Sequence, residues 1–413
     1  MTATAKSSLW RHHDFRLYWT GQASDVLGSS LSSVAIPLVA VVSLHATTWQ
    51  AAVLAAVQKT PPLLFSLPAE AWCDRVRKRP LMMATSLICA AAMGSIPLAA
   101  AYGRLSLIQL WVAAFVVGSC HVVGMAASLS YIPHLLPPHR LLEANAKLAS
   151  ANTLADIGGP ALAGALIGVI GAARAVAADA VSYLVTAWCT LHIRSPEGAP
   201  SPPTAKPNLR SEIRAGLAYT WGHPVIGPLV TTNAITSTVL AGTNAIWVVY
   251  LIRELHWSPE AFAVVTSTGA SGGFLASLVT PRLTARYGAG PVMISALTLT
   301  PVSQLPLLLA SPGPAGQLWV GCGLFVQLFG AVTHGLTQRT VRQHACTPGM
   351  QGRMQATGQW TAFGLRPFAA LLAGYASTAL GLHTTLALAT CLLILPPIRL
   401  ALTPIPALRL ATP

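Results

Sequence analysis

Residues 106–130 read SLIQLWVAAFVVGSCHVVGMAASLS, a run without a single Lys, Arg, Asp or Glu. A helix needs about 20 apolar residues to cross the hydrocarbon core of a bilayer, so this run is long enough to span it. The whole chain shares the bias, because 53% of its 413 residues are hydrophobic and 9% are charged. Soluble domains carry about 25% charged residues. The composition therefore predicts a protein whose solvent is lipid.

Eleven further apolar runs accompany this one. We predict membrane-spanning helices at 17–43, 50–71, 80–101, 106–130, 145–170, 173–193, 224–251, 259–280, 291–310, 316–337, 354–378 and 380–401. The runs are too long and too uniformly apolar for the alternating strands of a transmembrane barrel. The first span follows a polar segment and is too long for a signal sequence, so we expect no cleavable signal peptide. The expected fold class is an all-α integral membrane protein with twelve transmembrane helices.

Lys and Arg residues are unequally distributed between the two sides of these spans. Twenty of the 25 lie in segments on the side of the amino terminus, and three lie in the opposite loops. Because basic residues accumulate in cytoplasmic loops, we expect a multi-pass protein of the cell (inner) membrane with both termini in the cytoplasm. This topology explains the net charge of +14. No basic surface with interleaved aromatic residues occurs, so nucleic acid is not an expected partner.

The spans form two groups of six, which predicts two helical bundles. We assign residues 1–193 to an amino-terminal bundle, 194–222 to a cytoplasmic linker and 223–413 to a carboxy-terminal bundle. The linker opens with a Pro/Ser-rich stretch. Residues 208–221 then carry an apolar residue at every fourth position, which predicts an amphipathic helix on the membrane surface.

The two halves echo each other in sequence. Arg75 and Pro80 follow the second span, and Arg286 and Pro291 follow the eighth at a constant offset of 211 residues. Internal repeats of this kind are typical of transporters whose binding site lies near the midplane between the halves. The pattern predicts a transporter built from two related units.

Residues 67–79, LPAEAWCDRVRKR, carry the most specific motif. They resemble the G-x-x-x-D-R-x-x-R-R loop between helices 2 and 3 of the major facilitator superfamily. Asp74, Arg75 and Arg79 match, and Glu70 stands in place of the leading Gly. The resemblance implies two six-helix bundles with pseudo-two-fold symmetry. It also implies a cytoplasmic gate made by these four residues with Arg286. The alternative, that the charges only set topology, is favoured for the other two basic residues of the loop.

Residues 159–164, GPALAG, resemble part of a motif typical of the superfamily's antiporters. Gly159, Pro160 and Gly164 match, and the alternative reading is ordinary close packing of small residues around a kink. Stretches at 14–22, 143–148, 179–184, 212–217 and 352–354 are similar to the drug- and macrolide-efflux branch. This resemblance implies export of drug-like compounds.

Charges inside predicted spans are functional candidates because they are costly in a membrane. The proton-coupling candidates are Asp25, Lys59, Asp156 and Arg366. Asp25 and Lys59 lie at depths that differ by about 6 Å, which predicts a buried pair that protonation of Asp25 would open. A static salt bridge is the alternative. Asp156, one turn before Gly159, is the first candidate for proton carrier. Arg366 is a candidate partner for Asp156 or for an anionic substrate.

Milder polar and aromatic residues also lie inside the spans and predict a wide, mostly apolar cavity. The substrate-cavity candidates are His121, Asn233, Asn244, Gln327, His334, Gln359 and Trp360. Such a cavity suits a bulky amphiphile better than a sugar, which needs dense hydrogen bonding. For the two histidines the alternative is a packing role. Asp179, in the sixth span, is assigned a structural role with Arg174.

Several function classes lack their signatures in this sequence. It contains no G-x-x-x-x-G-K-[ST] phosphate-binding loop, no catalytic triad and no cluster of metal ligands. The seven cysteines form no C-x-x-C pair, so free structural thiols are expected. We therefore expect neither an enzyme nor a metal or cofactor requirement, with the proton gradient as the energy source.

Together these features predict an antiporter that exports small amphiphilic compounds, such as drugs, antibiotics or natural products, by alternating access. Its expected partners are the small-molecule substrate, protons and the lipid bilayer, and we expect a monomer. Export of this kind is associated with antibiotic resistance. Two alternatives stay open, namely an importer or uniporter of a small metabolite on the same fold and a non-transporting membrane receptor.

Overall fold

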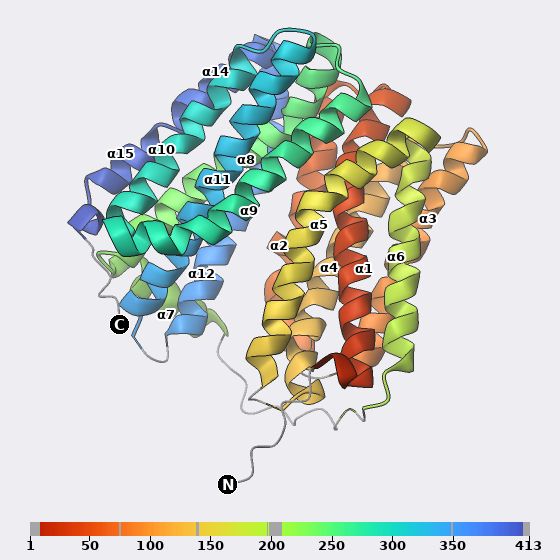
Figure 1. Ribbon diagram of the computed structural model, residues 1–413, viewed down its shortest axis with the longest axis horizontal. Helices are drawn as coiled ribbons and strands as arrows, with labels where there is room; N and C mark the ends of the chain where they lie inside the picture. The colour runs from red at the N-terminus through yellow and green to blue at the C-terminus, as the bar shows by residue number, and fades with distance from the viewer. Residues whose placement is uncertain are drawn as a thin grey trace. The chain divides into compact units, whose positions relative to one another are not determined.

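The computed structural model describes residues 9–73, 76–137, 140–195, 197, 209–347 and 350–407, and the regular structure within these ranges is entirely helical. Figure 1 shows the helices, coloured in chain order. They are α1 (His13–Leu38), α2 (Thr48–Cys73), α3 (Lys78–Ala101), α4 (Leu107–Leu135), α5 (Leu141–Ile170), α6 (Ala172–His192), α7 (Leu209–Gly222), α8 (Ile226–Val249), α9 (Pro259–Tyr287), α10 (Ala289–Leu308), α11 (Pro314–Ala345), α12 (Gln351–Gly364), α13 (Arg366–Leu380), α14 (Leu382–Leu392) and α15 (Leu395–Ala401).

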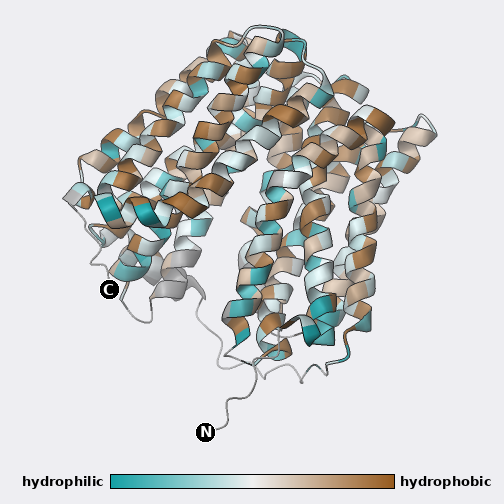
Figure 2. Ribbon diagram, viewed as in Figure 1, coloured by the Kyte–Doolittle hydropathy of each residue, from teal (hydrophilic) through white to brown (hydrophobic). Residues whose placement is uncertain are grey.

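Within the described ranges, nine helical stretches are long and apolar enough to cross a membrane. Large apolar side chains point outward from them, including Ile108, Val169 and Leu318, each more than two-thirds exposed. Such exposure suits contact with lipid, whereas a soluble monomer exposes only small apolar patches. In Figure 2 hydrophobic residues dominate the helices, and hydrophilic residues gather at ends such as the start of α1. The prediction of an all-helical, multi-pass membrane protein is confirmed, and the number of twelve spans stays a prediction.

The chain divides into two compact units, residues 1–44 with 64–204 and residues 45–63 with 205–413. In the first unit α1 packs against α5 and α6, and α3 packs against α4 and α6. In the second unit α11 packs against α9 and α10, and α8 packs against α13. The sequence placed residues 45–63 with the amino-terminal bundle, whereas here the first part of α2 belongs to the second unit.

The helices α1 and α8 end in the same way. Each continues into one π-helical turn, Val39–Ser43 after α1 and Tyr250–Glu254 after α8. His45 and His256 then adopt the left-handed backbone conformation, with φ of 50° and 54°. A non-glycine residue in this region is uncommon. Both helices are therefore followed by the same unusual change of backbone direction, which we call the corner.

The helices that follow also begin alike. The hydroxyl groups of Thr47 and Ser258 accept hydrogen bonds from backbone amides three residues on, at 3.2 Å in both cases, and cap α2 and α9. All these features recur at an offset of 211, the offset found between the sequence motifs. Glycines with positive φ extend the repeat at an offset of 210, namely Gly103 and Gly313, and Gly171 and Gly381.

The predicted span 354–378 is not one helix. It is interrupted at Leu365, where α12 ends and α13 begins. Pro367, the second residue of α13, has no amide hydrogen to donate to the carbonyl of Phe363, one turn earlier. A second helix therefore begins at Arg366, inside the apolar segment. The predicted amphipathic helix at 208–221 is present as α7.

Candidate functional site

The first unit contains a cavity of about 410 Å³. This volume lies within the range of about 300–1,000 Å³ that is usual for small-molecule sites. Its polar wall residues include Gln22, Asp25, His121, Asn145, Asn152 and Tyr183. Its apolar wall residues include Val26, Met82, Met125, Leu129, Ile132 and Leu148. The cavity thus offers a wall of mixed apolar and polar groups, an arrangement that fits an amphiphilic molecule.

Asp25, on α1, is an acidic residue of the cavity wall. The side chain is half-buried, and its Oδ1 atom is buried with no hydrogen-bond partner among the residues that the structure describes. A buried carboxylate oxygen without a partner is costly and marks a functional candidate in a membrane protein. The structure therefore places this predicted residue on the wall of the cavity, and its coupling to protons stays a prediction.

A second carboxylate, Asp179 on α6, is buried near the cavity but does not line it. It is 1% exposed and close enough to Asp25 for the two groups to interact electrostatically. Its Oδ1 atom accepts a hydrogen bond of 3.2 Å from the hydroxyl of Ser182. Arg174, its expected partner, is exposed, and the groups that interact with Asp179 include Ser32 of α1, Ser182 of its own helix and Cys89 of α3.

The close approach of α1 and α6 creates this pair of carboxylates. A Cβ atom on Gly28 would lie 2.1 Å from the Ser182 hydroxyl and 2.5 Å from Oδ1 of Asp179, so only glycine fits there. One residue on, Ser29 Oγ lies 3.3 Å from the Tyr183 hydroxyl. The contact joins residues about 150 positions apart. The sequence therefore showed each acid separately but not their proximity.

The structure places His121 on the cavity wall, as the sequence predicted for a substrate-cavity residue. Gln22, Asn145 and Asn152, which were not predicted from the sequence, line the same wall. Polar residues inside apolar spans were the available signal. It did not single these three out, because cavity and lipid faces of a helix differ only in what packs around them.

The antiporter-like residues join α5 to α1. A Cβ atom on Gly159 would lie 2.4 Å from the Cβ of Ser30, and Pro160 and Gly164 are buried. This is the close packing that small residues allow between membrane helices. Asp156, one turn earlier, is exposed on α5. It is not among the residues of the cavity wall.

The predicted cavity residues of the second unit are dispersed. Asn244 and Gln327 share a pocket of about 20 Å³ with Trp247, which is room for about one water molecule. His334 is buried on α11, with Nδ1 3.3 Å from the carbonyl oxygen of Met293. The structure leaves Asn233 half-buried on α8, and Gln359 and Trp360 exposed on α12.

The predicted basic candidates, Lys59 and Arg366, both belong to the second unit. Asp25 belongs to the first unit, so the predicted pairing of Asp25 with Lys59 stays a prediction. Arg366 is the first residue of α13 and donates a hydrogen bond of 2.6 Å from Nε to the hydroxyl of Ser237 on α8.

The predicted gate is described only in part. Asp74 and Arg75 lie outside the described residues, as does the side chain of Glu70. Arg286 is exposed at the end of α9, with its guanidinium carbon 5.3 Å from the ring centre of Tyr287. The role of these residues in gating stays a prediction.

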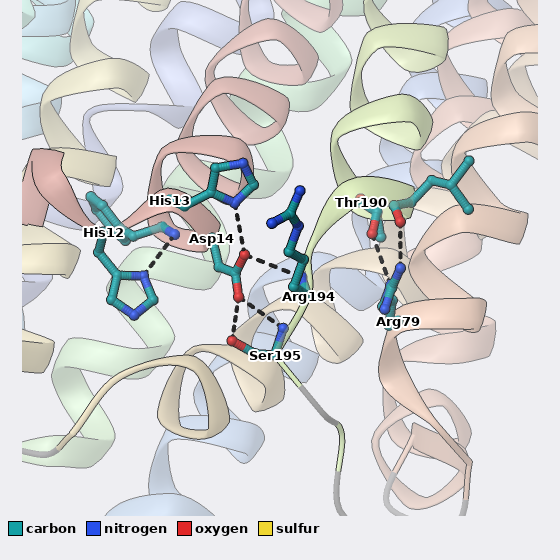
Figure 3. A network of polar contacts seen from close by, with 9 residues as sticks. His12, His13, Asp14, Arg79, Thr190, Arg194 and Ser195 are labelled. Atoms are coloured by element: carbon teal, nitrogen blue, oxygen red, sulfur yellow. Dashed lines mark hydrogen bonds and ion pairs between the residues drawn. The ribbon is translucent and has the colours of Figure 1, made fainter.

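Arg79 ties the start of α3 to the end of α6. Its Nε donates a 2.9 Å hydrogen bond to the carbonyl of Thr190, and its terminal nitrogen donates to the carbonyl of Leu191 (Figure 3). In return, Glu197 accepts hydrogen bonds from the first backbone amides of α3, one of them from Arg79 at 3.1 Å. Cations suit helix carboxyl ends and anions suit amino ends, so each charge caps the helix that it fits.

Asp14 ties α1 to the same place. Its carboxylate accepts hydrogen bonds from the backbone amides of Arg194 at 3.1 Å and Ser195 at 2.8 Å, and from the Ser195 hydroxyl (Figure 3). His13 Nδ1 lies 3.1 Å from Oδ1, the carboxylate oxygen that also accepts from Arg194. Neither Asp14 nor Glu197 was singled out from the sequence, because the amides that they bind lie more than 100 positions away in the chain.

Comparisons with known proteins agree on one family. The model of the Major Facilitator Superfamily matches residues 18–365. Multidrug efflux pump Tap of Mycobacterium tuberculosis is 26% identical over 371 residues, 87% of this chain and 85% of that protein. Macrolide efflux protein A of Streptococcus pyogenes is 21% identical over 335 residues, 79% of this chain and 82% of that protein.

A solved structure shows the same fold at low sequence identity. The crystal structure of a bacterial homologue of the iron transporter ferroportin matches with a TM-score of 0.74 at 16% identity. The match covers 96% of this chain and 99% of that one. It concerns the fold alone, because identity this low carries no information on substrate.

Proposed function

The chain belongs to the Major Facilitator Superfamily, and on that premise we propose that it exports small amphiphilic compounds in exchange for protons. Its relatives Tap and macrolide efflux protein A are named for efflux. The cavity of the first unit supports an amphiphilic substrate through its size and its mixed wall. Transport proceeds in this proposal by alternating access between the two sides of the membrane.

One observation carries the coupling to protons, namely Asp25 on the cavity wall with Asp179 behind it. A proton on Asp25 neutralises the wall, and its departure restores a negative charge there. A ligand shifts a conformational equilibrium only by its differential affinity for the two states. Asp25 meets that requirement in the proposal if its proton is held more tightly in one state than in the other. Asp179 acts as a positioning group through the contact between α1 and α6.

Everted membrane vesicles test the proposal. Respiration acidifies their interior, which quenches an acridine dye, and a panel of antibiotics and dyes is then added. An antiporter exchanges internal protons for the compound, so fluorescence recovers with the wild-type protein. We expect Asp25→Asn to abolish this recovery, because the asparagine cannot release a proton. We expect Asp179→Asn to reduce it.

Asp156→Asn is the matched control, since it changes an acid of the same unit that does not line the cavity. It should leave the recovery intact. Loss of recovery in Asp156→Asn alone would instead make Asp156 the proton carrier, as the sequence analysis expected. Uptake driven by an inward proton gradient would favour an importer. Ligand binding without any proton movement would favour a receptor.

A further inference from the structure

Two basic side chains lie together in the second unit, at the point where α2 passes α13. The two helices run antiparallel and touch through small residues. A Cβ atom on Gly374 would lie 2.3 Å from that of Ala52, and one on Gly364 would lie 3.4 Å from a methyl group of Leu63. Lys59 falls between these contacts on α2, level with the start of α13. It is close enough to Arg366 for the two positive charges to interact.

The guanidinium group of Arg366 is held in a fixed orientation. Its Nε donates a 2.6 Å hydrogen bond to the hydroxyl of Ser237, and its central carbon lies 4.3 Å from the ring centre of Phe363. These contacts occupy the Nε–H group of Arg366 and one face of its guanidinium plane. The terminal nitrogens have no acceptor within the described part of the chain, and a guanidinium fork of this kind binds two oxygens of one anion.

The helix interruption adds positive potential at the same place. The first turn of a helix leaves backbone N–H groups without helical partners and carries a partial positive charge. Interrupted membrane helices use such ends to bind anionic substrate groups. Because α13 begins at Arg366, the backbone amides of its first turn lie beside the guanidinium group and add to the positive potential there.

The second unit offers no nearby acid among its described side chains. Glu254 lies 17 residues after Ser237, about 25 Å further along α8. Glu254 and Glu260 are both exposed at the junction of α8 and α9. Lys59 is exposed as well, and a charge within a membrane helix faces water or a ligand rather than lipid. The site thus has an open side and a surplus of positive charge.

We propose that Lys59, Arg366 and the amino terminus of α13 form a binding site for an anionic group, a carboxylate or a phosphate. Arg366 contributes the oriented fork and Lys59 the point charge. The inference rests on the proposed function in one respect, because it narrows the exported amphiphiles to those with an acidic group. The same chemistry fits the phosphate of an anionic lipid, and the experiment separates the two sources.

Binding to the purified full-length chain in a non-ionic detergent tests the site. The probes are a dansyl-labelled fatty acid and its uncharged methyl ester. We expect the wild-type protein to bind the acid about tenfold more tightly than the ester, as one charge-assisted contact provides. Lys59→Gln and Arg366→Gln should each remove this preference while ester binding is retained, which shows that the variants are folded. Ser237→Ala should weaken it in part, because the fork loses its orientation.

Arg282→Gln is the matched control, an exposed cation of α9 in the same unit. It should keep the preference for the acid. The proposal is overturned if the wild-type protein binds acid and ester equally, or if Arg282→Gln loses the preference as fully as Arg366→Gln. Competition then identifies the source. Displacement of the probe by phosphatidylglycerol assigns the site to lipid, and displacement only by carboxylate compounds assigns it to substrate.

The outcome can be separated from that of the vesicle assay. If neutral compounds still release protons from vesicles but the protein binds acid and ester equally, the export proposal is supported and the anion site is overturned. If the preference for the acid depends on Lys59 and Arg366 but no compound moves protons, the anion site is supported and the export proposal is overturned.

Discussion

Position 28 of α1 is glycine because the side chains of Ser182 and Asp179 occupy the space where a Cβ atom would lie. The contact sets the distance between α1 and α6 and with it the position of Asp179 behind Asp25. Overpacking in a close contact of this kind costs about 1–3 kcal/mol.

We expect Gly28→Ala to lower the thermal stability of the purified protein and to reduce compound-driven proton release, because α1 must move away from α6. Gly158→Ala is the control, since a Cβ atom there has nothing within 4 Å. It should leave stability unchanged or raise it by up to about 1 kcal/mol, as expected for Gly→Ala in a helix. Thermal unfolding in detergent checks both. Equal melting of Gly28→Ala and the wild-type protein would contradict the packing argument.

At the scale of single residues, the sequence identified Asp25 because an acid within an apolar run is visible without any structure. It identified Asp156 by the same rule, yet that side chain is exposed and Asp25 lines the cavity. The face of a helix that meets a cavity depends on which helices pack around it. For the same reason Asp179 was assigned to Arg174 on its own helix, since its contacts with α1 are not visible in sequence.

At the scale of elements, charged caps join the ends of α1, α3 and α6. Asp14 accepts hydrogen bonds from Arg194 and Ser195, the residues that follow α6. We expect Asp14→Ala to destabilise the protein by about 1.5–3 kcal/mol, the value of hydrogen bonds to a charged group. The segment after α6 should then be freed, so trypsin should cleave after Arg194 more rapidly. Limited proteolysis and thermal unfolding measure the two effects.

Glu143→Ala is the control for this change. Glu143 is also an acid in the first turn of a helix, but it makes only an exposed ion pair of 3.7 Å with Lys147. Such pairs contribute about 0.3–0.5 kcal/mol. Cleavage after Arg194 at the wild-type rate in Asp14→Ala would show that the cap does not hold this segment.

The hydropathy pattern predicted most elements because a long apolar run has few alternatives to a helix. It did not predict the interruption at Leu365, since membrane helices tolerate proline and Pro367 alone did not indicate a break. It also did not predict the π-helical turns after α1 and α8. The π-helical turns depend on the path of the chain after the helix ends, and an apolar run does not indicate that path.

At the scale of the whole molecule, the charge distribution predicts both termini in the cytoplasm. A green fluorescent protein fused after the last residue should therefore fluoresce, and alkaline phosphatase at the same position should be inactive. Phosphatase inserted after Arg104, in a predicted external loop, should be active and serves as the control. Active phosphatase at the carboxyl terminus would reverse the assigned orientation.

The sequence predicted two halves from the linker and the repeated motif. The assignment of residues 45–63 to the second unit was not predicted. It depends on Ala52 and Leu63 meeting glycines more than 300 positions away. Contacts of small residues at such separation leave no periodic pattern in a single sequence.

The repeated corner allows residues of the two halves to be matched by a fixed difference in residue number. Residues 39–50 and 250–261 keep one backbone path, although only the Leu-His pair at their centre is identical. The offset of 211 makes Thr236 the counterpart of Asp25, so the acid of the cavity wall has no acidic twin. The later offset of 210 makes Asp156 and Arg366 counterparts of opposite charge. A duplicated ancestral segment would leave such a record, with the scaffold retained twice and the ionic chemistry divided between the copies.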